Sequence, residues 1–290
     1  MTCYTVDLVS AVDPAAQDAL EELDRRMADF YNGDAMTQYY AHAEAANVSW
    51  SEDCGQALIR KLASPGSRVV DFGCGSAHAL RHLSDTGVAY TGCDVSAKQI
   101  EANQRAFGAA AHFISSNLYG TPFPDDAFDL AFSTYVLEHL VWPHRCLTEM
   151  VREVKPGGFI VLVCPHFRPY NRIPSLSYGS YNAPIRDRLR QKDFFGVIRH
   201  LWLRQVHYPS LLRRDYPPQT WPFLINVSPS CLDGDYYPDN DAVYITHAPE
   251  ITAFLASLGA SDVTDHYMGM YRISRRQDTV VVVAQKRLEQ

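Results

Sequence analysis

Two glycines and an aspartate stand at a spacing that suits the binding of a nucleoside. The segment "VVDFGCGSA" runs from apolar residues into Gly73-x-Gly75, and Asp94 ends the next apolar segment, "YTGCD". Glycines let the backbone turn sharply and approach a ligand closely, and a carboxylate at the following strand end can accept both ribose hydroxyls. A glycine loop alone is weak evidence, whereas the loop and the acid together are much stronger.

Two histidines have side chains that could accept a proton near neutral pH. His166 follows an apolar run in "VCPHFRPYNR", and His139 belongs to "VLEHL". For each, the alternative is an ordinary loop or packing residue, and the sequence leaves that choice open. No set of His, Asp and Glu at ligand spacing accompanies them and the chain has no CxxC pair, so we predict no metal site.

Helical and extended patterns alternate between residues 51 and 166, and these elements must position the chemistry. We expect strands at 67–72, 88–95, 111–116, 128–134 and 159–164, with helices at 51–62, 77–83, 96–107 and 143–154. Ser96 and Gln99 have capping-box spacing, and "KPGG" is expected to stop the fourth helix. Strands that read as continuous apolar runs and alternate with helices predict a parallel sheet covered on both faces.

The regular pattern breaks after Pro165 and returns near residue 247. "HAPEITAFLASLGA" predicts a helix closed by Gly259, and "SDVTDHY" and "TVVVVAQ" predict two late strands. We therefore divide the chain into an N-terminal helical lid (1–50), a core (51–166 and 245–290) and an inserted substrate cap (167–244).

The core resembles the class I S-adenosylmethionine-dependent methyltransferases, in their small-molecule branch. The resemblance rests on "VVDFGCGSA", "YTGCDVS", "TPFPDDAFDLAFSTYVLEHL" and "EMVREVKPGGFIVLVCP", which cover roughly residues 67–166. It implies an α/β, Rossmann-like sheet of seven strands, mostly parallel, with helices on both faces and an antiparallel last strand. A nicotinamide dinucleotide site is disfavoured, because the loop reads G-x-G-x-A-H and lacks the third glycine at dinucleotide spacing. Ala77 stands where a third glycine is frequent in the methyltransferase family.

The resemblance also assigns residues to the cofactor, S-adenosyl-L-methionine, whose product is S-adenosyl-L-homocysteine. By position, Asp71, Gly73, Cys74 and Gly75 would hold the methionine end. Asp94, with Val95 beside it, would bind the ribose, and Ser116, Asn117 and Leu118 would flank the adenine. Ser133 would lie beneath the methionyl group. Asn117 departs from the family, where many members carry Asp, so a neutral amide oxygen would accept the adenine amino group.

The acceptor is expected beyond the carboxyl ends of the strands, where ligands bind in open α/β sheets. We predict that it contacts Tyr135, Phe167, Arg168, Tyr170 and Arg172. Residues 167–221 carry ten basic side chains against three acidic ones, which indicates either a solvated helix face or a pocket for an anionic group. The stretches "CPHFRPY" and "DNDAVYITHAPEITAFLASLGA" more loosely resemble methyltransferases of polysaccharide and glycosylated-metabolite pathways.

These observations favour O-methylation of a sugar or natural-product metabolite in secondary metabolism, with a histidine base. The alternatives are N- or C-methylation of a small metabolite, or methylation of RNA or protein through the basic cap. A net charge of −7 argues against general nucleic-acid binding. The N-terminus lacks an apolar signal core, and seven scattered cysteines suit a reducing compartment, so we expect a cytoplasmic protein. The expected partner is a small molecule, anionic or sugar-containing, and not a membrane; a homodimer stays open.

Overall fold

The structure is a computed structural model that describes residues 8–33, 54–165, 167, 185–202, 206, 210, 222–232, 240–268 and 279–288. Its strands are β1 (Leu8–Ser10), β2 (Arg68–Phe72), β3 (Ala89–Asp94), β4 (His112–Ser115), β5 (Phe128–Thr134), β6 (Val154–Pro165), β7 (Leu224–Asn226), β8 (Ala260–Asp262) and β9 (Thr279–Lys286). Its α-helices are α1 (Gln17–Asn32), α3 (Cys54–Leu62), α4 (His78–Leu83), α5 (Ala97–Phe107), α6 (Pro143–Glu153), α7 (Ile185–Arg190), α8 (Phe194–Trp202), α10 (Ala248–Ser257) and α11 (Thr264–Met268). Short 3-10 turns are η1 (Pro14–Ala16), η2 (Gly108–Ala110), η3 (Leu137–His139) and η7 (Ser230–Leu232).

Seven strands form one sheet in the order β4-β3-β2-β5-β6-β9-β8. β2 to β6 run parallel to one another, while β9 lies antiparallel between β6 and β8. The predicted α/β fold, with its mostly parallel sheet and antiparallel last strand, is therefore confirmed. Since the chain crosses between strands through helices, the carboxyl ends of β2, β3 and β5 meet at one edge. We call this edge the cofactor edge.

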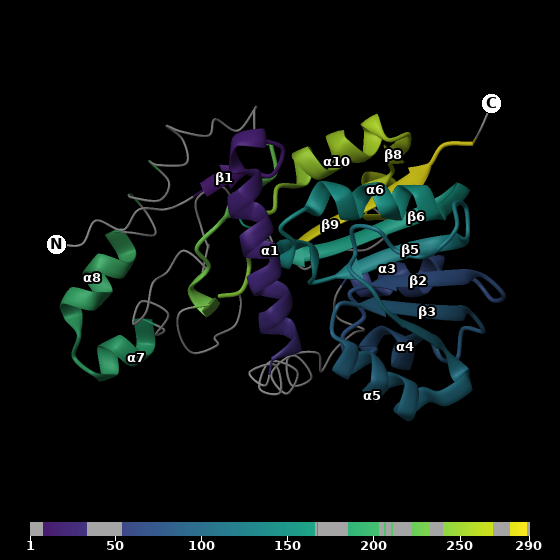
Figure 1. Cartoon of the computed structure of the whole chain (residues 1–290), viewed down its shortest axis with the longest axis horizontal. Coiled ribbons are helices and arrows are strands. Elements are labelled where there is room, and N and C mark those ends of the chain that lie inside the picture. The colour runs from purple at the N-terminus through teal and green to yellow at the C-terminus, as the bar shows by residue number, and fades with distance from the viewer. Residues whose placement is uncertain are drawn as a thin grey trace.

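The two faces of the sheet bury separate apolar clusters, because successive strand side chains point to opposite sides. One face carries Val69, Leu130 and Phe132 against side chains of α3, α4 and α5. The other carries Val70, Ala131 and Leu162 against side chains of α6 and α10. Figure 1 shows the same layers, with α6 and α10 on one side of the sheet and α4 and α5 on the other.

The helix α5 begins without the predicted capping box. Ser96 precedes the helix, but its side chain makes no capping hydrogen bond. The Ser96 N–H instead donates to Asp94 Oδ1 at 2.9 Å, which removes the donor that Gln99 would have bonded. Gln99 turns to Asn103, donating to its Oδ1 at 3.1 Å. The carboxylate of Asp94 at the end of β3 therefore accepts the N–H that Gln99 would have accepted in a capping box.

Two element boundaries also differ from the predictions. "KPGG" does not separate α6 from a strand, because β6 already begins at Val154. The register between β5 and β6 shifts there, so these residues form an irregularity inside a 12-residue strand, with Gly157 at φ +82°. At 261–267 the strand β8 ends at Asp262, whose Oδ1 accepts the Thr264 N–H and starts the short helix α11.

Segments far apart in the chain form a second layer at one end of the sheet. β1 pairs antiparallel with β7, and the Asn226 N–H donates to the Val243 carbonyl at 2.8 Å. α1 buries Leu20 and Leu23 in the same cluster as the inner side chains of α6. Figure 1 shows α1 across this end of the sheet, with α7 and α8 beyond it. No described helix is long and apolar enough to span a membrane.

Candidate active site

The loop between β2 and α4 can be formed only with glycine at its first position. Gly73 lies at φ +78°, and a Cβ there would stand 2.5 Å from both methyl carbons of Val136. Gly75 also has positive φ, at +45°. The N–H groups of Gly73 and Cys74 donate to the Cys93 carbonyl at 2.8 and 3.0 Å, so the loop is tied to the end of β3. This loop therefore lies closely against β3 and the turn that follows β5.

Asp94 fastens the same loop from the end of β3. Its Oδ2 accepts the Gly75 N–H at 2.9 Å, and its Oδ1 accepts the Ser96 N–H at 2.9 Å. Burial raises the pKa of this carboxyl, and the backbone donors at Ser96, Gly75 and Val95 oppose that rise. Each carboxylate oxygen has a second lone pair, so the group can still accept hydroxyl donors from a ribose.

Asp71 places a second carboxylate beneath the loop. It is 2% exposed, and its Oδ2 accepts the Tyr90 hydroxyl at 2.6 Å. Burial raises its pKa to about 7, the Tyr90 hydrogen bond lowers it, and the neighbouring charge of Asp94 raises it. Oδ1 of Asp71 has no hydrogen-bond partner among the described residues. A buried acceptor of this kind calls for a hydrogen-bond donor, and the ammonium group of a ligand would suit it.

The remaining predicted cofactor residues lie at or just after the carboxyl ends of β4 and β5. Asn117 is exposed and its Oδ1 accepts the Tyr119 N–H at 3.1 Å, while Leu118 is buried. The Ser116 hydroxyl donates to the Asn117 carbonyl at 2.9 Å. Ser133 is buried at the end of β5, and its hydroxyl has no partner in the described part of the chain.

Two residues that the sequence reasoning missed also shape the loop. Asn103 is buried on α5, and its Nδ2 donates to the Gly75 carbonyl at 2.7 Å. Gly92 on β3 leaves room for the loop, because a Cβ there would lie 2.8 Å from Cys74 Sγ. Asn103 follows the loop by almost thirty residues and belongs to no motif that we used, so only the fold reveals its contact.

On the acceptor side, the structure describes only some of the predicted residues. Tyr135 follows β5 in a left-handed conformation, at φ +55°, and Phe167 is buried. His139 is nearly buried in η3 and lies between the carboxylates of Glu138 and Asp241. The predicted base His166 lies outside the described residues, as do the predicted acceptor contacts Arg168, Tyr170 and Arg172.

The residues at the cofactor edge fit S-adenosylmethionine, which combines a nucleoside with a cationic amino-acid end. Asp94 offers acceptors for the ribose, and the unpartnered oxygen of Asp71 offers one for the ammonium group. The donors and acceptors of this site therefore match the cofactor in both charge and kind.

Comparisons with known proteins agree with this geometry. The family model described as "Methyltransferase domain" matches residues 70–162. An uncharacterized methyltransferase of Mycobacterium tuberculosis is 36% identical over 98 residues, which are 33% of this chain and 39% of that protein. Residues 70–162 therefore carry a methyltransferase domain. The chain thus spans about two fifths of that relative's length.

Two further proteins are similar to the chain beyond this domain. The malonyl-[acyl-carrier protein] O-methyltransferase of Serratia marcescens is 29% identical over 138 residues, which are 46% of this chain and 53% of that protein. The Burkholderia thailandensis 1,6-didemethyltoxoflavin-N1-methyltransferase, solved with S-adenosylhomocysteine, has a TM-score of 0.54 at 13% identity, covering 95% of this chain and 91% of that one. At that identity, the second likeness supports the methyltransferase fold alone.

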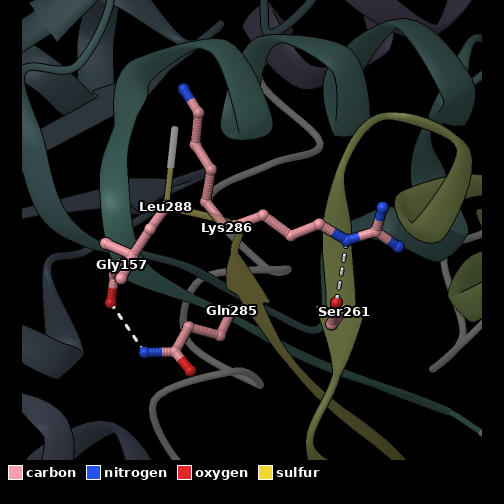
Figure 2. Close-up of a pocket in the computed structure, with 6 residues that line it drawn as sticks. Gly157, Ser261, Gln285, Lys286 and Leu288 are labelled. Atoms are coloured by element: carbon pink, nitrogen blue, oxygen red, sulfur yellow. Dashed lines mark hydrogen bonds between the residues drawn. The ribbon is translucent and has the colours of Figure 1, made fainter. Parts of the chain in front are cut away.

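A shallow pocket lies at the opposite edge of the methyltransferase domain. It has a volume of about 200 Å³ and lies between the start of β6 and the end of β9. Figure 2 shows that Gln285 and Ser261 already make hydrogen bonds to other residues that line it. Gln285 Nε2 donates to the Gly157 carbonyl at 2.9 Å, and Arg287 Nε donates to Ser261 Oγ at 3.1 Å. We assign it no part in the reaction.

Proposed function

We propose that this protein transfers the methyl group of S-adenosylmethionine to a small-molecule acceptor, at a hydroxyl oxygen of a sugar or natural-product metabolite. The observation that carries the proposal is the pair of carboxylates at the cofactor edge. Asp94 is bonded to the glycine loop, and Asp71 keeps one buried oxygen without a partner among the described residues. Bound there, the cofactor supplies an electrophilic methyl group on a sulfonium.

The chain's own residues have three tasks in this proposal. Asp71 and Asp94 bind and orient the cofactor, which supplies much of the rate in a reaction that depends on alignment. Buried side chains such as Ser133 and Phe167 exclude water from the transferred group. A histidine takes the proton of the acceptor hydroxyl, and His139 and His166 are the two candidates from the sequence.

An oxygen acceptor is favoured by the O-methyltransferase activity named for the Serratia marcescens relative. The toxoflavin neighbour is an N-methyltransferase by name, so nitrogen remains the second candidate for the acceptor atom. The basic cap supported a polymer acceptor in the sequence reasoning. Arg188 in α7 is nonetheless buried and pairs with Asp193 at 3.0 Å, which leaves Arg186 and Arg190 as exposed cations of that helix.

The proposal is tested by incubating the full chain with S-adenosylmethionine that carries a trideuterated methyl group and with metabolite fractions of the source organism. We expect S-adenosylhomocysteine to form with one fraction, and one metabolite to gain the labelled methyl on oxygen. Label on nitrogen would move the assignment to N-methylation. Binding of S-adenosylhomocysteine without turnover in any fraction would instead indicate a cofactor-binding protein that transfers no methyl group.

A polymer acceptor is tested separately. Changing Arg186 and Arg190 to Ala should leave turnover of a small metabolite unchanged. An RNA or peptide signal that disappears in this double variant would favour the polymer, and its absence at low salt would count against it.

A further inference from the structure

His139 lies between two carboxylates that come from different parts of the chain. Its Nε2 is 3.5 Å from Glu138 Oε1, and its Nδ1 is 3.4 Å from Asp241 Oδ2. Glu138 belongs to the same 3-10 turn, whereas Asp241 follows it by about a hundred residues. Both distances exceed a good N–H···O hydrogen bond, so a small movement of the ring would complete either contact.

Asp241 is held more firmly than its position in a loop would indicate. Its side chain is fully buried, and its Oδ2 accepts the hydroxyl of Tyr31 from α1 at 3.0 Å. The rings of Tyr31 and His139 also meet edge to face, with centroids 6.1 Å apart. Its other oxygen, Oδ1, has no hydrogen-bond partner among the described residues. A buried carboxylate with a vacant acceptor is costly unless a ligand or a cation uses it.

The backbone fixes this cluster beside the cofactor loop. The Glu138 carbonyl accepts the N–H groups of both Val243 and Tyr244 at 2.8 Å, which binds the segment 240–247 to η3. The His139 N–H donates to the Val136 carbonyl at 2.9 Å, and the side chain of Val136 fills the space against Gly73. The imidazole is therefore one short turn away from the loop that holds the cofactor.

We propose that Asp241 is the positioning residue of the active site, holding the tautomer of His139 that carries its proton on Nδ1. Nε2 is then the atom that takes the acceptor proton, and this step rests on the proposed function. As the acceptor oxygen bonds to the methyl carbon, the carbon–sulfur bond breaks and its electron pair stays on sulfur. The hydroxyl proton passes to Nε2, and the imidazolium that results is stabilised by Glu138 and Asp241.

The titratable groups that contact this imidazole include the carboxylates of Glu138 and Asp241 and the ring of Tyr31. The charge of Glu138 also acts on the thiol of Cys164 on β6. Burial and the charge of Glu138 raise the pKa of that thiol well above its usual range, so it stays neutral. The two carboxylates therefore dominate the charge around the ring.

The first test needs no acceptor and no activity. NMR of ¹⁵N-histidine-labelled full chain reports the tautomer and titration of each ring, and His139→Gln identifies the His139 signals. We expect neutral His139 to carry its proton on Nδ1 in the wild-type protein. A neutral ring protonated on Nε2 would overturn the proposal without any variant of Asp241.

The second test removes the charge of Asp241 but keeps its shape. In Asp241→Asn, the midpoint of the His139 titration should fall by about one pH unit or more, because one of two flanking charges is lost. Glu250→Gln is a matched control, since Glu250 is also a largely buried carboxylate that accepts a tyrosine hydroxyl, that of Tyr244 at 2.7 Å. An unchanged midpoint in Asp241→Asn, or an equal fall in the control, would contradict the assignment.

The third measurement connects the cluster to turnover. With the metabolite fraction that yields the labelled product, Asp241→Asn should lower kcat by about tenfold or more and shift its pH profile with the His139 midpoint. Its binding of S-adenosylhomocysteine, measured by calorimetry, should stay at the wild-type value. If no fraction supports turnover, the proposed function is contradicted, while the tautomer measured by NMR still tests the role of Asp241. Normal turnover in Asp241→Asn would remove Asp241 from the mechanism.

Discussion

The cofactor edge and the proposed acceptor side of this candidate active site are assembled in different ways. Gly75 and Asp94, which bond to each other at the cofactor edge, are 19 positions apart in the chain. Tyr31 and Asp241, which bond to each other on the acceptor side, are 210 positions apart. The first pair belongs to one strand-loop-helix-strand unit, and the second joins an N-terminal helix to a late loop.

Because of this difference, we expect sequence changes to alter the acceptor side more easily than the cofactor edge. The cofactor edge depends largely on backbone conformation, because its loop needs the positive φ angles of Gly73 and Gly75, and Asp94 stands at the end of a parallel strand. The proposed acceptor side combines His139, from within the matched domain, with Tyr31 and Asp241, which lie outside residues 70–162. One cofactor can therefore be combined with many acceptors by changing segments outside that domain.

The largest expected effect is on the affinity for S-adenosylhomocysteine, which should depend on the cofactor edge and not on the acceptor side. Asp94→Ala should weaken S-adenosylhomocysteine binding by about 100-fold or more, because it removes two charged acceptors for the ribose and releases the Gly75 N–H. Tyr31→Phe, on the acceptor side, should leave that affinity within about twofold, since it removes only the hydroxyl bonded to Asp241. Isothermal calorimetry measures both.

Asp262→Ala is the matched control for Asp94→Ala. Asp262 also ends a strand, and its Oδ1 accepts the N–H two residues on, at Thr264, as Asp94 does at Ser96. It lies at β8, on the sheet's far edge, so this control should bind the ligand like the wild type. Equal affinity in Asp94→Ala and wild type would remove Asp94 from the cofactor site.

The same contrast explains what the sequence could predict. The sheet, its order of helices and strands, and the loop at Gly73 follow from local patterns and from a family motif within residues 67–166. The predicted capping box of α5 was wrong because the Ser96 N–H donates to Asp94. Asp94 lies within reach only because the glycine loop holds it there in the folded structure. Asn103 and Asp241 carry no local signal, since each acquires its partner only when distant elements pack together.

A second, intermediate effect should appear as a pH dependence confined to the cofactor edge. The pKa of Asp71 is raised to about 7 by burial, and its ionised form is the one that attracts the ligand's ammonium group. As pH rises through 7 the carboxylate ionises, so affinity for S-adenosylhomocysteine should increase. Only about a tenth of the molecules are ionised at pH 6, which predicts binding about tenfold weaker than at pH 8.

Calorimetry at both pH values, in two buffers of different ionisation enthalpy, checks this expectation. Below pH 7, binding should release a proton from Asp71, since the bound cation favours the ionised form. Asp71→Asn should bind more weakly at pH 8 and lose most of the pH dependence. A wild-type affinity that is flat between pH 6 and 8 would show that Asp71 is already ionised in the free protein.

The smallest expected effect tests how far backbone conformation alone determines the cofactor edge. Ala77 lies in the left-handed region, at φ +53° and ψ +40°, just before α4, and its methyl group is fully buried. Glycine would relieve about 1–2 kcal/mol of backbone strain but lose about 0.8 kcal/mol of methyl burial and gain unfolded-state entropy. These terms nearly cancel, so Ala77→Gly should change the free energy of unfolding by less than about 0.5 kcal/mol.

Ala79→Gly, also buried but inside α4, has no strain to relieve and should cost about 1–2 kcal/mol. Urea titration compares the two; an equal loss in both would show that packing of the Ala77 methyl, and not the left-handed turn, controls this loop.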